Sequence, residues 1–294
     1  MNVMLRTRAR LLRDLALLAN DPVNSTRWPK EVKAACLNQA IDDVADSVLL
    51  PYVYTITGGF TSTTFETALP HYVNRKYMQP QIKSDAVNPN LNTGDNTLET
   101  WLDLPGWTVE SDGEAGAVLR LTSLPYQEEG RILYWSPPSS VPLEDGVVLD
   151  AVGLSDTSMT VTMGEADDAV PIVGFVSINN EWLQYNGTTR SGTTVTLQNL
   201  VRGIHGTSAS THSSQDTVLW GVGADRHMLW EMYTLGAMSR LARSLMFSNP
   251  NDMQQYQWAM RYYDQMVTEK MMSYRPSYVP SARLRVTHLL TELE

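Results

Sequence analysis

Apolar residues recur at helical spacing in the first fifty residues of the chain. The first run covers residues 4 to 19, and the sequence ANDPVNS then interrupts it. A second run begins at Pro29, which suits the first turn of a helix, and ends before Pro51. The residues expected to pack from this second helix are Leu37, Ile41 and Val44. This pattern predicts a pair of amphipathic helices at the start of the chain.

Helical spacing returns after residue 224. The sequence DRHMLWEMYTLGAMSRLARSLMF carries an apolar face that includes Leu235, and a further helix is predicted from Met253 through Met260 to Val267. Both faces are rich in methionine, which is more typical of an adaptable core or a subunit contact than of a ligand site. We expect the two helix pairs to pack together, because each helix has one apolar stripe.

The middle of the chain has a different pattern. From about residue 52 to 222, Thr, Val, Tyr and Trp alternate with polar residues, and Gly, Pro, Asn and Asp recur at short intervals. This pattern predicts short antiparallel strands, and the proline-rich SPPSSVP separates two sets of them. The expected fold class is therefore α+β, a helical bundle formed by the N- and C-terminal helices with one or two inserted β modules. The expected domains are a helical bundle (1–51 and 224–274), two β modules (52–138 and 139–223) and an extended C-terminal arm (275–294).

The amino-acid composition limits the classes of protein to which this chain can belong. The chain has 294 residues, of which 43% are apolar, so two or three folded domains are expected. The lone Cys36 excludes an internal disulfide and a cysteine-based zinc cluster. No apolar run reaches the roughly 20 residues that cross a bilayer, and the arginines dispersed through the first residues do not resemble a secretory signal. A net charge of −10 argues against general affinity for nucleic acid, although DNA can pass through an acidic channel.

One stretch, LVRGIHGTSASTH at residues 200 to 212, invites a search for a metal site. His205 and His212 are potential ligands, but only Asp216 lies near them in sequence, and no third ligand at a recognisable spacing is evident. We therefore expect a structured turn here, with no bound metal and no cofactor.

A phosphate site in the same stretch is less favoured. A cradle made by Gly203, Gly206 and Thr207 requires a helix directly after the glycines, whereas the following residues are typical of turn and strand. The acidic clusters of the chain lie in turns or on a solvated helix face, and no nucleophile elbow, HExxH or P-loop motif occurs. These observations predict a protein that is not an enzyme.

The same stretch carries a resemblance. Together with the preceding NNEWLQYNGTTRSGTTVTL, it resembles a β module found in tailed-phage virion proteins, and the match covers roughly residues 172 to 220. The resemblance implies a structural turn in which glycines supply positive φ, while the arginine and histidine bind loop carbonyls. The residues of this turn are Arg202, Gly203, Gly206, Thr207 and His212.

Two other segments resemble one family of these proteins. STRWPKEVKAACLNQAIDDVADSV is similar to the early helices of phage head-to-tail connector (adaptor) proteins, and LPGWTVESDGEAGAVLRLTSLPYQEEGRILYWSPP resembles the β segments inserted in them. The order of helix pair, β insertion, helix pair and arm is also typical of these connectors.

The resemblance implies a non-enzymatic homo-oligomeric ring, twelve-fold by family analogy, in the neck of a virion assembled in the host cytoplasm. Its partners would be the portal protein above it, a tail or nozzle protein below it, and DNA that passes without sequence-specific binding. The C-terminal arm is expected to dock on the portal. Its candidate contact residues are Arg283, Leu284, Arg285, Val286, Leu289 and Leu290.

An alternative is a tail-tip or baseplate protein whose β modules bind a host surface glycan. Its expected contacts are exposed aromatic residues such as Trp101, Trp107, Trp135 and Trp182. In such a protein the helices would be a small mounting element, yet here they form a large part of the chain. A carbohydrate-active enzyme would need a carboxylate pair that the sequence does not display. The connector is therefore the favoured interpretation.

Overall fold

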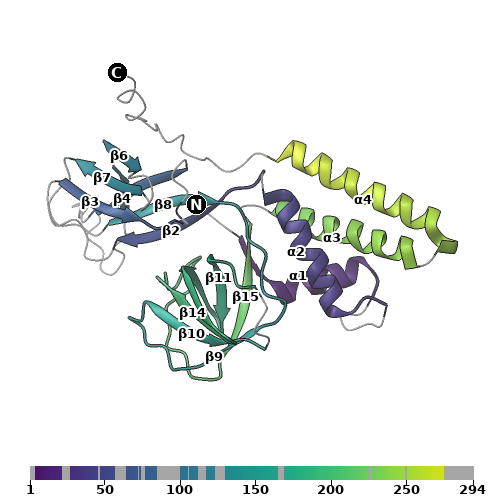
Figure 1. Ribbon diagram of the computed structural model, residues 1–294, viewed down its shortest axis with the longest axis horizontal. Coiled ribbons are helices and arrows are strands. Elements are labelled where there is room, and N and C mark those ends of the chain that lie inside the picture. The colour runs from purple at the N-terminus through teal and green to yellow at the C-terminus, as the bar shows by residue number, and fades with distance from the viewer. Residues whose placement is uncertain are drawn as a thin grey trace, which may run out of the picture. The chain divides into compact units, whose positions relative to one another are not determined.

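A computed structural model of the chain gives its fold (Figure 1). The residues it describes are 4–21, 27–45, 47–56, 64–71, 73, 77–84, 100–104, 106–111, 117–122, 130–164, 169–224, 227–248 and 250–274. They form two compact units. The first contains the residues up to Leu50 and those from Pro137 onward, and the second is Pro51–Ser136.

The protein is mostly antiparallel β. Of the residues that the structure describes, 37% lie in strands, which form three sheets, and four α-helices accompany them. The predicted fold class, a helical bundle with inserted β modules, is therefore wrong. Helical periodicity can be recognised within a single segment of sequence. A sheet, in contrast, forms when short strands that are distant in sequence pair with one another. The strong helical pattern therefore predicted a fold built around the helices, whereas the sheets dominate it.

The first strand is a specific correction. Residues Met4–Thr7, predicted to begin a helix, form strand β1 and pair antiparallel with β15 (Thr217–Ala224), so that Thr7 lies opposite Gly221. Helix α1 (Arg8–Leu18) begins only after this pairing ends. The Thr7 hydroxyl caps it by accepting a hydrogen bond from the Arg10 N–H at 3.3 Å.

The largest sheet has eight strands and dominates the first unit. Its other members are β9 (Gly146–Val148), β10 (Ser158–Thr162), β11 (Val173–Ile178), β12 (Glu181–Asn186), β13 (Thr188–Ser191) and β14 (Thr194–Gln198). The strand order is β12-β11-β15-β9-β10-β14-β13, with β1 beside β15.

This sheet curls into a small barrel. Only Gly187, at φ +125°, separates β12 from β13, so the path of paired strands starts and ends in one bent strand. The barrel is filled by large side chains: Tyr185 and Trp220 are almost fully buried and meet edge to face, with ring centroids 6.3 Å apart. The residues of the resembling module thus form a closed, packed unit.

The helices of the same unit are α1, α2 (Lys30–Ala45), α3 (His227–Ser248) and α4 (Met253–Ser273), with a short 3-10 turn at Pro250–Asp252 before the last. Helix α3 contacts the other three. It approaches α2 closely at Gly236, where an added Cβ would lie 2.9 Å from the Ala40 Cβ. Of the predicted packing residues, Leu37, Ile41, Val44 and Leu235 are buried and Met260 is half-buried.

Helices and barrel are linked within this unit, so the helices do not stand as a separate bundle. Arg8 of α1 is buried, and its guanidinium donates to the Pro142 carbonyl at 2.6 Å and to Asp145 at 2.9 Å. Asn38 of α2 donates to the Val141 carbonyl at 2.7 Å. These bonds tie both early helices to the segment that leads into β9. None of the described helices is long and apolar enough to cross a lipid bilayer.

The second unit holds two smaller sheets. One has the order β2-β8-β4-β5, from the strands Leu50–Ile56, Gly130–Ser136, Met78–Ser84 and Thr100–Asp103. The other has the order β3-β7-β6, from Thr64–Leu69, Ala117–Thr122 and Trp107–Ser111. In the second sheet Arg120 lies between Glu66 at 2.8 Å and Glu110 at 2.7 Å, a cross-strand arrangement on an exposed face.

Candidate functional site

The turn singled out in the sequence folds around one buried carboxylate. Glu181, the first residue of β12, has a fully buried side chain. The Arg202 guanidinium binds it in a fork, with Nε 2.8 Å from Oε1 and Nη2 2.9 Å from Oε2. Such a planar two-point contact fixes the orientation of both groups.

Four further groups of the turn reach the same carboxylate. The Gly203 N–H donates to Oε1 at 3.0 Å, and the Ser210 N–H and hydroxyl donate to Oε2 at 3.0 and 3.3 Å. His212 Nε2 lies 2.8 Å from Oε2. Both ends of the turn, about ten residues apart, are therefore held by one side chain. The arrangement satisfies a charge that would otherwise be costly to bury.

The pKa of Glu181 shows which effect dominates. Burial by itself raises the pKa of this carboxyl, but the hydrogen bonds from Arg202, the Ser210 N–H and His212, with the charge of Arg202, outweigh burial and hold the pKa at about 2. The group is ionised throughout the neutral range. It is therefore suited to holding an ion pair and unsuited to proton transfer near pH 7.

The other turn residues also direct their polar groups inward. Arg202 donates to the Gly153 carbonyl at 2.7 Å and also to the Ser210 carbonyl. The Thr207 hydroxyl accepts from the Trp182 N–H at 3.1 Å and donates to the Ile204 carbonyl at 2.8 Å. Of the residues predicted for the turn, Arg202, Gly203 and His212 thus meet at Glu181, while Thr207 binds backbone groups beside them.

The two glycines have different requirements. Gly203 has φ +62°, and a Cβ there would lie 2.8 Å from the Ala209 backbone nitrogen. Gly206 has φ +80°, and a Cβ there would meet nothing within 4 Å. Conformation alone favours glycine at Gly206, whereas conformation and a close backbone approach both require it at Gly203.

The two histidines of this stretch do not converge. His212 is buried against Glu181, while His205 is exposed and meets the edge of Phe175 at 6.0 Å between centroids. Asp216 lies 4.0 Å from His212 Nδ1 and accepts the Ser213 N–H at 2.9 Å. Over the part of the chain that the structure describes, no group of three or more His, Cys, Asp or Glu side chains is placed to hold a metal ion.

The other residues predicted to contact partners are those of the C-terminal arm and the tryptophans of the glycan-binding alternative. The six arm residues Arg283, Leu284, Arg285, Val286, Leu289 and Leu290 lie outside the described residues, as does the side chain of Trp101. Trp135 is buried, and Trp107 and Trp182 are half-buried. A surface platform of these tryptophans, as the glycan-binding alternative expects, gains no support from that burial.

A small cleft of about 190 Å³ lies between α2, α3 and α4. Its polar walls bind one another: Arg240 donates to Asp43 and to Gln39, the latter at 3.2 Å, and the Ser239 hydroxyl donates to Asp264 at 2.5 Å. These bonds join the three helices. We therefore interpret the cleft as part of the helix packing.

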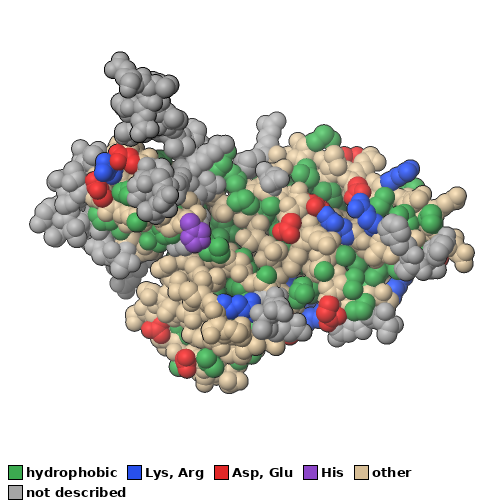
Figure 2. Space-filling model, viewed as in Figure 1, with side chains coloured by type: hydrophobic (Ala, Val, Ile, Leu, Met, Phe, Trp, Pro, Cys, Tyr) green, Lys and Arg blue, Asp and Glu red, His purple; other side chains and the backbone are tan. Residues whose placement is uncertain are grey.

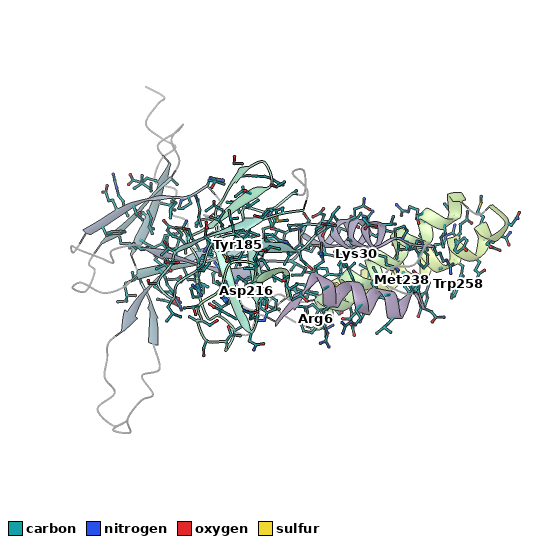
Figure 3. The ribbon with its side chains drawn as sticks, turned by 90° about the horizontal axis from the view of Figure 1, so that it is seen from below. Arg6, Lys30, Tyr185, Asp216, Met238 and Trp258 are labelled. Carbon is teal, nitrogen blue, oxygen red and sulfur yellow. The ribbon has the colours of Figure 1, made fainter. Side chains whose placement is uncertain are left out.

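Helix α4 presents a surface that the sequence analysis did not identify. None of its described residues is buried, and the side chains of Trp258, Tyr262 and Met272 are 68%, 45% and 76% exposed. The rings of Trp258 and Tyr262 stack, with centroids 5.3 Å apart and planes 9° from parallel. Figure 3 shows Trp258 at the end of the helices remote from Asp216. Large apolar side chains this exposed are typical of a protein contact.

Sequence reasoning also missed Glu181, the centre of the turn. Its partners lie between 21 and 31 positions later in the chain, a distance without a recognisable spacing. The one available signal was a charged residue at the head of the strand EWLQYN, directly before Trp182 and Leu183.

Comparison with known proteins identifies no relative. No protein-family model, curated protein or solved structure matches the chain. The function is therefore argued from the residues and their geometry.

Proposed function

We propose that the protein is a structural subunit of a tailed-phage virion, the head-to-tail connector (adaptor) ring beneath the portal. The observation that carries the proposal is the closed network around Glu181. The turn that carries the resemblance directs its polar side chains to partners inside the barrel. Arg202 alone donates four hydrogen bonds, two to the Glu181 carboxylate and one each to the Gly153 and Ser210 carbonyls. A motif used in this way serves a rigid building module, which is the role that the resemblance implies.

The overall charge is compatible with this role. A net charge of −10 gives DNA phosphates no counterion release on contact, so a ring of such subunits would let DNA pass without holding it. The exposed apolar face of α4 supports the proposal further, because a ring subunit must bury surface against its neighbours.

Electron microscopy of the purified chain, alone and mixed with the portal protein of its virion, tests the proposal. We expect a ring seated coaxially on the portal, with one copy of the chain per ring position. A portal protein from an unrelated phage is the control and is expected to remain bare. Absence of any complex with the cognate portal, together with retention of the chain on host glycans, would contradict the connector and favour the tail-tip alternative.

A further inference from the structure

Two helices of the first unit carry its most exposed apolar side chains. Among the described residues these are Met272 at 76%, Leu17 at 75% and Trp258 at 68% exposure. Leu17 belongs to α1 and the other two to α4, and each of these helices contacts α3. Figure 2 shows hydrophobic side chains reaching the surface over the helices. The subunit thus exposes large apolar side chains on two different helices.

The outer face of α4 forms a continuous stripe, here called the α4 stripe. Its members recur three or four positions apart and are all exposed: Trp258, Tyr262, Gln265, Glu269 and Met272. The aromatic end is organised by the Trp258–Tyr262 stack. Glu269 is the acidic group of the stripe, and the Gln265 side-chain amide donates to it at 2.8 Å. Arg261 flanks the aromatic end, two turns away from Glu269.

The outer face of α1 forms a complementary stripe. It consists of Arg10, Arg13 and Leu17, all exposed, and the first turn of the helix contains no acidic residue. Asp14 beside it is engaged by Arg6. This α1 stripe is therefore basic at its start and apolar at its end.

The two stripes match in spacing as well as in charge. Arg10 and Leu17 are seven residues apart, and so are Tyr262 and Glu269. Seven residues span about 10.5 Å of helix. In an antiparallel arrangement Leu17 therefore meets the aromatic end of the α4 stripe while Arg10 meets Glu269.

We propose that the α1 stripe of one copy packs antiparallel on the α4 stripe of a second copy. This inference rests on the proposed function, since it assigns the contact between neighbours in the ring. Because the two stripes differ, the contact is head-to-tail, and such a contact closes into a ring when it is repeated by rotation. Pairing of α4 with its own copy would leave Leu17 and the two arginines uncovered.

A complementation experiment tests the contact. Leu17→Asp disables only the α1 stripe and Trp258→Asp only the α4 stripe. We expect each variant alone to remain monomeric in sedimentation at concentrations where the natural chain associates. An equal mixture is expected to form one-to-one pairs that grow no further, because each variant still offers one intact stripe.

The matched control is Leu154→Asp, a substitution at a 58% exposed apolar residue between β9 and β10. It is expected to associate like the natural chain. At dilutions where the natural chain is also monomeric, all three variants are expected to melt at its temperature, since the replaced side chains are exposed.

A charge exchange tests the register. Arg10→Glu and Glu269→Arg are each expected to weaken association about tenfold, because each brings like charges together. Both substitutions in one chain are expected to restore association, since the pair is then re-formed with reversed signs.

The inference is overturned if the mixture of Leu17→Asp and Trp258→Asp fails to pair, if both variants associate normally, or if the natural chain stays monomeric. A ring on cognate portals that survives both substitutions would overturn this contact and leave the connector intact. Pairing of the mixture without any ring on portals would support the contact and count against the connector.

Discussion

A single buried charge organises the longest turn of the barrel. Glu181 is fully buried, and its ion pair with Arg202 is completed by backbone N–H groups from Gly203 and Ser210. A buried ion pair adds little net stability over a well-packed apolar alternative, but removing one partner leaves the other charge uncompensated. Substitutions at Glu181 or Arg202 are therefore expected to be among the most destabilising in the barrel.

Glu181→Gln is expected to lower the free energy of unfolding at pH 7 by about 3 kcal/mol, because Arg202 loses its counter-charge. The folded pKa of Glu181, about 2, lies below the ordinary value of 4.5. Its stabilisation is thus present above pH 4.5 and is lost as the pH falls toward 2. Urea unfolding between pH 7 and 2 measures both effects, and the variant should lose less stability over the acid range than the natural chain.

The control for this pH series is Glu66→Gln, which alters an exposed pair with Arg120. We expect it to change stability by about 0–1 kcal/mol. An acid dependence of Glu181→Gln as steep as that of the natural chain would show that other carboxylates govern acid unfolding.

The two turn glycines form a second matched pair. Gly206→Ala is expected to cost roughly 1–2 kcal/mol, the price of a left-handed backbone with a Cβ. Gly203→Ala should cost more, because its Cβ would also lie 2.8 Å from the Ala209 nitrogen. Thermal unfolding of both variants gives the order. Equal losses would mean that the turn relaxes around the new methyl group.

Helices α2 and α3 approach each other closely at Gly236. Gly236 lets the backbone of α3 come close to Ala40, and Arg240 one turn later binds Asp43 and Gln39 of α2. The glycine contact and the hydrogen bonds of Arg240 thus lie next to each other between the same two helices. The separation of α2 and α3 is set by the absence of a side chain at this position.

Gly236→Leu should therefore force the two helices apart and lower stability by about 1–3 kcal/mol. Ala35→Leu is the control, since it adds the same kind of volume at an exposed position of α2. Chemical unfolding followed by tryptophan fluorescence measures the difference. A Gly236→Leu variant as stable as Ala35→Leu would indicate that α3 can shift without loss.

The C-terminal arm, residues 275–294, is the segment that we expect to dock on the portal. Tyr274, directly after α4, is buried, so a chain that ends there retains the described contacts of the last helix. The arm has too few apolar residues for a core of its own, and arms repeated around a ring would gain strength by avidity.

A chain truncated after Tyr274 is expected to keep its melting temperature and to lose attachment to cognate portals. Co-sedimentation with portals, at equal loading of the full-length and truncated chains, measures the loss. Equal binding by both chains would assign portal docking to another surface.

Features that depend on neighbouring residues are recognisable from the amino-acid sequence. The periods of apolar positions identified the four described helices, but α1 begins at Arg8 and not at Met4, and α2 ends at Ala45, before the predicted end at Pro51. The glycines at 203 and 206 were interpreted as positive-φ positions, and the structure shows that backbone at both. These features are local, since a turn or a helix is decided within a few residues.

Features that depend on residues distant in the chain emerge when the chain folds. Met4–Thr7 is a strand because it pairs antiparallel with β15, more than 200 residues later in the chain. The barrel closes because β12 and β13 are one strand bent at Gly187. Glu181 became the centre of the turn through partners that share no fixed spacing with it. The outward face of α4 was equally hidden, because a helical stripe does not say which side α3 will cover. Pairing and burial join residues far apart in the chain, and a periodic pattern in the sequence does not encode which ones meet.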